Sequence, residues 1–421
     1  MKVGTAKVDI TPREAVDLTG YLAREQGSTG VLDPLSARAL YVESGPSRLL
    51  WLHADLLGFE RETAERFRRW ASARLGLSSR EVILSTCHTH SGPAVMRLFG
   101  CGRFEEAYVE RLAGWMEEAA ERAVARTEPA APVVATTMCD LGVDRRGKAS
   151  AHTDPRLTVL AWQRPDRTYA AALVNYGMHN VALGPANRLV SGDVIGHAEA
   201  ALERVLPGSP VTLFTLGGAG NVNPPRPAPG DSPDQMRAWG DLLAQKAQEA
   251  LAGPRPLGDR LTIRAAVLGV PLDVYDGPRI CRFAERIIEK GAGLPADVHG
   301  RLVQAVREWR GKMTRLAERH QTPETTDLQI AAVAFDDLWL VGLSAEVFSS
   351  MGDRLRELTG REVRVVSYAN GVFGYLPTAE AFAEGGYEPA ESFLYYGSFP
   401  LKPEAFEQVA RRAADLVVTG A

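Results

Sequence analysis

The sequence predicts an α/β protein in which a mixed β-sheet core is flanked by helices. In the first half of the 421-residue chain, short apolar runs alternate with amphipathic helical windows, a pattern typical of a sheet covered by helices. A second group of strand-like runs begins at about residue 260. At 45% hydrophobic and 24% charged residues, the composition is that of an ordinary globular protein. We expect one large domain over 1–421, with two lobes at about 1–255 and 256–421 as the alternative.

Each predicted element follows from local patterning. Strands are expected where β-branched and aromatic residues lie between turn signals, at 39–42, 49–52, 82–84, 158–162, 171–176, 211–215, 260–263, 328–335, 338–343 and 362–366. Helices are expected where apolar residues recur at helical spacing, at 60–75, 105–126, 195–205, 234–251, 296–320, 347–358 and 403–418. Asp336-Asp337 separates two apolar runs and predicts a hairpin, and Gly360 ends the helix before it.

Charge and cysteine content exclude several classes of protein. The formal net charge is −4 and the basic residues are scattered, so no broad basic surface for nucleic acid is expected. The four cysteines are irregularly spaced and favour a reducing compartment over a disulfide scaffold. No apolar run reaches the roughly 18 residues of a membrane span, and the N-terminus has no apolar signal segment. These features predict a soluble cytoplasmic protein.

The motif Cys-His-Thr-His-Ser-Gly-Pro at 87–93 follows directly on the apolar run 82–84. In an extended strand, residues two apart point the same way, so His88 and His90 would present both imidazoles from one face. The Ser-Gly-Pro turn would place the pair at a sheet edge, where ligands bind in open α/β sheets. The motif indicates a metal site, although one or both histidines could instead cap the turn.

Two further residues could complete such a site. His179 also lies just past a buried-looking strand, and three histidines past two strand ends favour a catalytic zinc, which needs about three protein ligands and an open position. Glu346 follows the apolar run 338–343 and would supply a carboxylate at the same edge. The alternatives are a hydrogen-bonded structural role for His179 and a favourable helix-dipole position for Glu346.

A glycine-rich turn, 217–220, follows the strand at 211–215 and would let a ligand or metal approach the backbone closely. No Gly-Lys-Ser/Thr follows it and no dinucleotide spacing is present, so nucleotide binding is disfavoured. Asp193 precedes a predicted helix and is expected to cap it.

Together these motifs resemble the neutral (non-lysosomal) ceramidases. The resemblance includes the histidine motif and runs in order through most of the chain, at 8–12, 20–21, 37–39, 191–193, 219–224, 345–348, 370–375 and 387–388. It implies a zinc amidase that cleaves an N-acyl bond, and a neutral-ceramidase-like catalytic domain.

The resemblance also implies site residues. The four implied zinc ligands are His88, His179, Glu346 and Tyr375. The implied active-site groups that contact substrate are His90, Arg145 and Tyr387, with the adjacent Arg146 as an alternative to Arg145. Zinc would lower the pKa of bound water to about 7, and these three residue types can donate to a developing oxyanion.

The chain departs from the ceramidase pattern in several places. Asn223 stands where the family has serine, Asn221 where it has aspartate, and Ala94-Val95 where it has glycines. The chain ends soon after its last predicted helix, so no C-terminal immunoglobulin-like domain is expected. We expect a short, bacterial-type cytoplasmic member that acts on a small-molecule or lipid-like N-acyl compound.

Three alternatives stay open at this point. The same zinc site could serve an esterase or lactonase, because an ester is attacked in the same way. An amidohydrolase barrel also uses His-X-His, although there the motif belongs near the first strand. Asn221 and Asn223 leave room for a metal- or ligand-binding protein without catalysis. The sequence does not indicate an oligomeric state.

Overall fold

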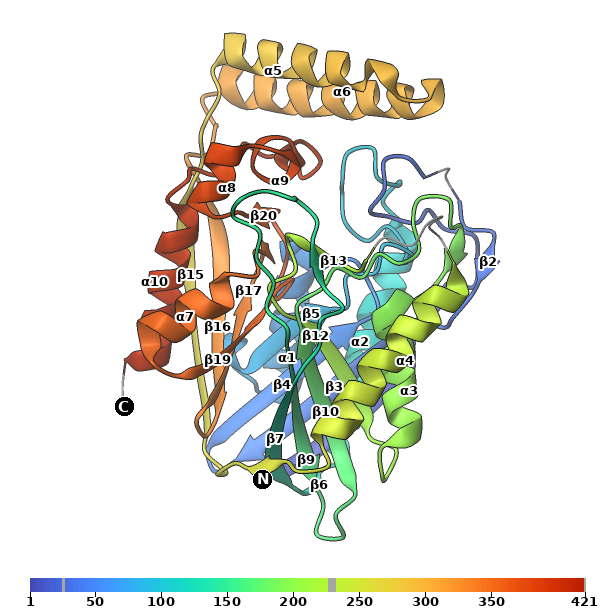
Figure 1. Cartoon of the computed structure of the whole chain (residues 1–421), viewed down its shortest axis with the longest axis vertical. Helices are drawn as coiled ribbons and strands as arrows, with labels where there is room; N and C mark the ends of the chain where they lie inside the picture. The colour runs from blue at the N-terminus through green and yellow to red at the C-terminus, as the bar shows by residue number, and fades with distance from the viewer. Residues whose placement is uncertain (25–26, 226–231, 420–421) are drawn as a thin grey trace.

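The computed structural model describes residues 1–24, 27–225 and 232–419, and its strands form three main sheets (Figure 1). The first sheet has the order β5-β4-β3-β1-β6, with β1 Lys2–Asp9, β3 Ser36–Ser44, β4 Ser47–Ala54, β5 Val82–Thr86 and β6 Glu128–Pro129. The second has the order β12-β10-β9-β7-β14, with β7 Ala131–Met138, β9 Arg156–Gln163, β10 Tyr169–Tyr176, β12 Val211–Leu216 and β14 Arg255–Pro256. The third has the order β15-β16-β17-β19, with β15 Leu261–Pro271, β16 Thr325–Phe335, β17 Leu338–Leu343 and β19 Glu362–Val366.

Three two-stranded pairs lie outside these sheets. They are β2 Gly30–Val31 with β11 Leu189–Val190, β8 Val143–Asp144 with β13 Val222–Asn223, and β18 Glu346–Val347 with β20 Tyr375–Leu376. The last pair brings two of the implied metal ligands side by side, because its register sets Glu346 opposite Tyr375.

Each main sheet packs one face against helices. Helices α1 Arg61–Leu75 and α2 Glu106–Ala125 cover the first sheet, and α3 Asp193–Val205 and α4 Pro233–Ala250 cover the second. Helices α7 Met351–Thr359 and α10 Ala405–Val418 cover the third. The shorter elements are α8 Ala379–Glu384, α9 Tyr387–Ala390 and the 3₁₀ turns Ser79–Glu81, Gly291–Gly293 and Ser392–Leu394.

The other faces of the three sheets meet in one apolar core. Trp51 of β4, Trp162 of β9 and Phe335 of β16 are all almost fully buried there. The rings of Trp162 and Phe335 lie edge to face at 5.2 Å. Burying such large side chains contributes strongly to stability, so this shared core fixes how the sheets sit against one another.

The arrangement of parallel strands defines the functional end of the molecule. The pairs β4–β5, β10–β12 and β17–β19 are parallel, so the carboxyl ends within each pair point the same way. The loops after β5 and β10 carry His88 and His179, and Glu346 begins the short strand β18 that follows β17. Ligand sites in α/β proteins commonly form at such ends.

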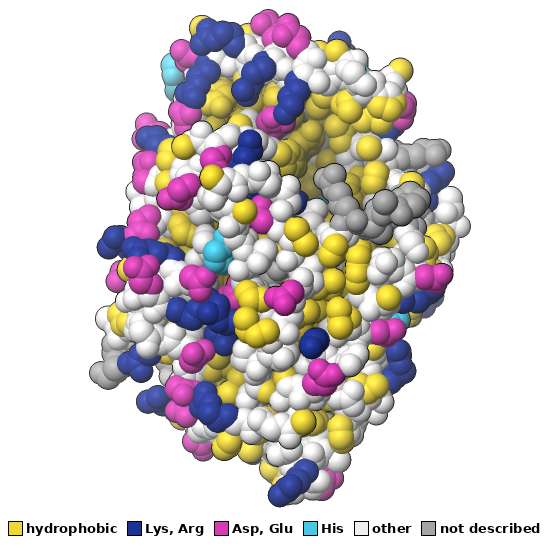
Figure 2. Space-filling model, in the orientation of Figure 1, with side chains coloured by type: hydrophobic (Ala, Val, Ile, Leu, Met, Phe, Trp, Pro, Cys, Tyr) yellow, Lys and Arg dark blue, Asp and Glu magenta, His cyan; other side chains and the backbone are white. Residues whose placement is uncertain are grey.

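A helical pair lies beyond the third sheet at this end. Helices α5 Gly277–Lys290 and α6 Ala296–Glu318 form the connection between β15 and β16, whose pairing runs from Leu261–Phe335 to Pro271–Thr325. Figure 1 shows the pair at the top of the molecule, and Figure 2 shows apolar side chains around a hollow beneath it. Arg301 Nε of α6 donates to the carbonyl oxygen of Leu22 at 2.8 Å, which ties the pair to the loop below.

The mixed α/β prediction is confirmed, and its element boundaries differ from the structure in specific places. The helix expected from residue 347 begins at Met351, because Glu346–Val347 pairs as a strand with Tyr375–Leu376. Helix α5 was not predicted. The barrel alternative is wrong, since the described strands form separate mixed sheets. Among the described helices, none has both the length and the apolar character that crossing a bilayer needs.

Candidate metal centre

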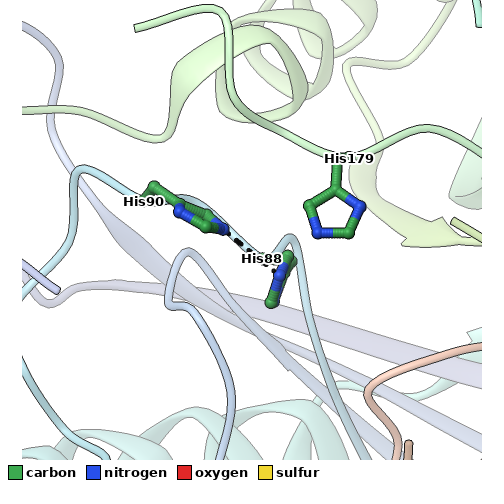
Figure 3. Close-up of side chains that lie close together, drawn as sticks. All are labelled: His88, His90 and His179. Atoms are coloured by element: carbon green, nitrogen blue, oxygen red, sulfur yellow. Dashed lines mark hydrogen bonds between the residues drawn. The ribbon is translucent and has the colours of Figure 1, made fainter. Parts of the chain in front are cut away.

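His88 lies in a turn and not in an extended strand. Strand β5 ends at Thr86, and His88 has a positive φ of 55°. The predicted strand geometry for the His-Thr-His motif is therefore wrong at His88. The expected convergence still occurs, because His88 Nε2 and His90 Nε2 lie 3.3 Å apart (Figure 3). A left-handed residue is costly for a side chain with a Cβ, and such strain is common at functional sites.

His88 and His179 are oriented by backbone carbonyls. His88 Nδ1 lies 2.6 Å from the oxygen of Leu57, and His179 Nδ1 lies 2.6 Å from the oxygen of Ala219. A carbonyl can only accept, so each Nδ1 carries the proton and each Nε2 keeps a lone pair. Histidines that bind metals are oriented in this way by partners on their other nitrogen.

The free nitrogens converge on one carboxylate. Glu346 Oε2 lies 3.4 Å from His88 Nε2 and 3.1 Å from His179 Nε2. His179 Nε2 is buried and meets hydrogen-bond geometry with no described residue. The ligand nitrogens of His88, His90 and His179 all lie within 4.8 Å of one another (Figure 3). His88, His90, His179 and Glu346 are called the histidine cluster below. Their imidazole and carboxylate groups fit a divalent metal such as zinc.

The environment favours the protonation states that metal binding needs. Burial, together with the nearby Arg145 guanidinium, lowers the pKa of His179 to about 4, which keeps its imidazole neutral. Burial and the neighbouring His88 likewise hold the pKa of His90 well below its usual range. Burial alone would raise the pKa of Glu346, but contacts with His88 and His179 hold it well below the usual value. These shifts keep His90 and His179 neutral and Glu346 ionised.

Two tyrosines, Tyr368 and Tyr396, contact Glu346, and Tyr368 also contacts His88. The Tyr396 hydroxyl donates to Glu346 Oε1, and the Tyr368 hydroxyl lies 3.5 Å from Oε2. The Tyr368 ring also stacks on the His88 imidazole at 3.8 Å. Tyr375, the fourth implied ligand, is opposite Glu346 in the β18–β20 pair and its ring lies parallel to that of His179 at 6.4 Å.

The two candidate arginines differ in what they contact. Arg145 Nη2 donates to the Tyr375 hydroxyl at 3.0 Å, and its Nε pairs with Glu388 Oε1 at 2.9 Å. Arg146 instead pairs with Glu384 and Glu388 and donates to backbone carbonyls, away from the histidine cluster. Of the two, Arg145 is the residue adjacent to the candidate metal ligands.

The two asparagines that depart from the family pattern hold the backbone around the site. Asn223 Oδ1 accepts from Arg145 Nη1 at 3.3 Å. Asn221 Oδ1 accepts from the Ser349 amide at 2.8 Å, and its Nδ2 donates to Asp144 and to the carbonyl of His152. Asn221 therefore joins the loop before β9 to the Ser349 backbone, whereas Asn223 contacts the Arg145 side chain.

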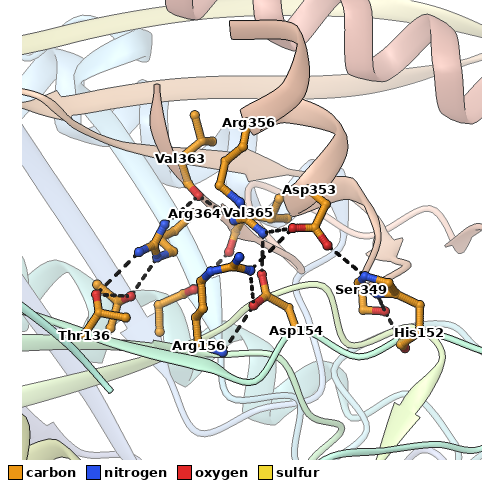
Figure 4. Close-up of polar contacts among 12 residues, drawn as sticks. Thr136, His152, Asp154, Arg156, Ser349, Asp353, Arg356, Val363, Arg364 and Val365 are labelled. Carbon is orange, nitrogen blue, oxygen red and sulfur yellow. Dashed lines mark hydrogen bonds and ion pairs between the residues drawn. The ribbon is translucent and has the colours of Figure 1, made fainter. Parts of the chain in front are cut away.

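Next to Asn221 lies a polar network that links the loop before β9 to helix α7 (Figure 4). His152 contacts Ser349 Oγ through Nδ1 and Asp353 through Nε2, each at 2.8 Å. This order resembles a nucleophilic triad, but Ser349 is only 2% exposed and its hydroxyl donates to the His152 carbonyl at 2.7 Å. The network therefore fixes the loop and offers no accessible nucleophile.

A cavity of about 280 Å³ opens onto the histidine cluster. Its lining residues are Gly20, Tyr21, Leu22, Ala23, Leu57, His88, His90, Leu98, Cys101, Glu346, Tyr375, Tyr387, Tyr395 and Tyr396. Tyr387 is 41% exposed in this lining. Gly20 packs against His90, since a Cβ built on Gly20 would lie 2.3 Å from His90 Nδ1. The cavity thus combines the candidate ligands with a mostly apolar and aromatic wall.

Sequence reasoning missed several residues of this site. The carbonyls of Leu57 and Ala219 carry no side-chain signal, because any residue type offers the same oxygen. Tyr368 and Tyr396 lie in aromatic, turn-rich segments, where only the concentration of tyrosines could have indicated them. Asp193, expected as a helix cap, accepts from the amides of Ala182 and Leu183 and so anchors the loop after His179.

A second buried group of ligand-type residues lies elsewhere, at His53, Asp55 and Glu199. Their ligand atoms also lie within 4.8 Å of one another. Arg38 Nη1 contacts Asp55 Oδ1 at 2.9 Å and Glu199 Oε2 at 2.6 Å. These four residues are called the arginine cluster below.

No family model matches the sequence. The neutral ceramidase of Pseudomonas aeruginosa is 26% identical over 97% of this chain and 71% of that protein. The neutral ceramidase of Drosophila melanogaster is 26% identical over 53% of this chain and 36% of that protein. The crystal structure of the Pseudomonas aeruginosa neutral ceramidase superposes with a TM-score of 0.76 at 22% identity, covering 99% of this chain and 74% of that one. A ceramidase complexed with C2 gives the same TM-score at 20% identity and the same coverage.

Proposed function

Because this chain is a homologue of neutral ceramidase, we propose that it hydrolyses a linear N-acyl amide of the ceramide type in a metal-dependent reaction. One observation supports this most strongly. His88 and His179, each fixed through Nδ1 by a carbonyl, direct their free Nε2 atoms at Glu346 on the wall of a cavity. That arrangement is the donor set of a catalytic metal with an open position.

In this proposal His88, His179, Glu346 and Tyr375 hold one zinc ion. When bound, zinc supplies Lewis acidity and lowers the pKa of water to about 7, which provides a nucleophile at neutral pH. The carbonyls of Leu57 and Ala219 keep the two imidazoles in the tautomer that binds metal. Tyr368 and Tyr396 hold the Glu346 carboxylate in position.

His90, Arg145 and Tyr387 act on the substrate side in this proposal. His90 Nε2 lies beside His88 Nε2 in the cavity, where it can donate to or accept from a bound amide. Burial alone would lower the pKa of Arg145, but Tyr375 and Glu388 raise it, so the guanidinium stays charged. A charged donor next to Tyr375 can stabilise the negative charge that develops on the carbonyl oxygen of the substrate amide. Tyr387 supplies a further hydroxyl in the cavity lining.

The identity of the metal as zinc and the cytoplasmic location stay predictions from the sequence. The proposed substrate is an N-acyl compound whose acyl chain enters the aromatic-lined cavity, with zinc as the cofactor.

The proposal is tested with a panel of N-acyl amides and matched esters, assayed with metal-loaded protein. We expect amide hydrolysis, loss of metal in His88→Ala, and metal retention with loss of turnover in His90→Ala. Hydrolysis of esters alone would replace the amidase by an esterase. Absence of turnover on both classes in fully loaded protein would contradict catalysis and favour a binding protein.

A further inference from the structure

A second, larger cavity adjoins the one at the histidine cluster. Its volume is about 660 Å³, and it lies between α6, the loop after the His-Thr-His motif and the loop before α10. Leu98 and Tyr396 line both cavities. These two side chains are therefore the wall between the candidate metal centre and the second cavity.

Tyr396 is held in this wall from three directions. Its hydroxyl donates to Glu346 Oε1 on the side of the histidine cluster. Its ring packs against Gly374, where an added Cβ would lie 3.4 Å from the ring. Its loop is joined to the opposite loop by the amide of Phe99, which donates to the carbonyl of Tyr395 at 2.9 Å. The wall is thus built from two loop segments that meet at Tyr396.

The lining of the second cavity is partly apolar and partly charged. Apolar side chains in its lining include Met96, Leu272, Met313, Leu316 and Phe399. Among its charged lining residues, Arg97 pairs with Glu60 and Arg61 pairs with Asp327. The lining also includes Glu62 and Lys312, and its apolar side chains are the part of the cavity that favours an alkyl chain.

The volumes limit what each cavity can hold. The cavity at the histidine cluster, at 280 Å³, has less than half the volume of the second cavity, at 660 Å³. The smaller cavity therefore suits an amide with a short acyl chain better than one with a long chain. A long acyl chain needs more room, and the second cavity offers it on the other side of Tyr396.

We propose that Tyr396 is a specificity-determining residue that limits the acyl chain to the smaller cavity, and that the second cavity is an alkyl-chain site reached when this wall is removed. The inference rests on the proposed amide hydrolysis for its substrate class. The inference goes beyond amide hydrolysis because it assigns the selection of acyl-chain length to the wall formed by Tyr396 and Leu98.

The test compares wild type with Tyr396→Ala and Tyr396→Phe on straight-chain N-acyl amides of 4 to 16 carbons. One measurement is kcat/KM of the metal-loaded protein, and the other is binding of the same amides to metal-free protein by calorimetry. In wild type we expect kcat/KM and binding affinity to rise with acyl-chain length only until the smaller cavity is full. In Tyr396→Ala they should continue to improve with length, by up to about fourfold for each further methylene buried.

Tyr396→Phe is the matched control. It keeps the ring in the wall but removes the hydroxyl that donates to Glu346. We expect it to keep the wild-type length profile while turnover falls. If Tyr396→Ala does not fold, Leu98→Ala opens the same wall from the other side and should shift the profile in the same direction.

Two results would overturn the inference. One is a length profile in Tyr396→Ala and Leu98→Ala that matches wild type in the binding experiment. The other is a shift in Tyr396→Phe as large as that in Tyr396→Ala, which would assign the effect to Glu346 and not to the wall. If no protein hydrolyses any amide but binding shifts with length as expected, the proposed reaction fails and the chain-length assignment stands.

Discussion

The histidine cluster and the arginine cluster both gather metal-ligand atoms, but their ligand types and surroundings differ. Each is buried, and each brings three such atoms within 4.8 Å of one another. In the arginine cluster the Arg38 guanidinium contacts both carboxylates, at 2.6 to 3.0 Å. In the histidine cluster the nearby Arg145 pairs with Glu388 and Tyr375, which leaves Glu346 to the imidazoles.

This difference shows that a count of ligands does not define a metal site. The arginine cluster contains its own cation, and both of its carboxylates contact that cation. Both clusters contain a buried imidazole nitrogen without a hydrogen-bond partner, His179 Nε2 in one and His53 Nε2 in the other. The histidine cluster, however, lies on the wall of a 280 Å³ cavity, where a metal and a substrate can enter. Access to a cavity is therefore the feature that indicates a site.

The largest expected effect separates the two clusters by metal content. His88→Ala should reduce bound zinc to less than half an ion per chain and lower turnover more than about 10³-fold, since even residues that only orient a ligand cost 10- to 100-fold. His53→Ala, the matched control in the arginine cluster, should leave zinc content unchanged. Elemental analysis of the purified proteins checks this. Equal loss of zinc in both variants would remove the distinction.

The next largest effect concerns stability. Arg38→Met should destabilise the fold by about 3–5 kcal/mol, because it leaves Asp55 and Glu199 buried without their cation. Arg145→Met should cost less, since Glu388 keeps Arg146 as a partner. Urea unfolding measures both. Adding Asp55→Asn and Glu199→Gln to Arg38→Met should recover much of the loss, and failure to recover would contradict the electrostatic explanation.

A smaller, pH-dependent effect belongs to the arginine cluster. Burial raises the pKa of Glu199 to about 7 and that of Asp55 to about 6. Between about pH 4.5 and 7 the folded state holds a proton on Glu199 that the unfolded chain has released, so this group lowers the unfolding free energy as pH rises. Relative to Glu199→Gln, wild type should lose about 3 kcal/mol across this range. A constant difference between the two proteins would contradict a raised pKa.

The sequence predicted most elements of the fold because their patterns are local. Apolar runs such as 82–84 and 171–176 fall within strands β5 and β10, and the amphipathic windows at 60–75 and 105–126 match α1 and α2 within a residue or two. The start of α7 was misplaced because the pairing of Glu346 with Tyr375 is a long-range contact that no local pattern contains.

Part of the candidate site has a local signal in the sequence, and part does not. His88, His90, His179 and Glu346 carry a signal, since each follows an apolar strand. The positive φ of His88, the carbonyls of Leu57 and Ala219 and the wall residue Tyr396 depend on how distant loops meet. The arginine cluster joins residues from 38 to 199, a separation at which sequence spacing says nothing about contact.

The central claim is that the histidine cluster, and not the arginine cluster, holds the metal. Anomalous diffraction at the zinc edge, from crystals of protein purified with zinc, tests it most directly. We predict a single strong peak about 2.0–2.1 Å from His88 Nε2 and His179 Nε2, next to Glu346. A peak of similar height among His53, Asp55 and Glu199, or no peak at His88 and His179, would contradict the claim.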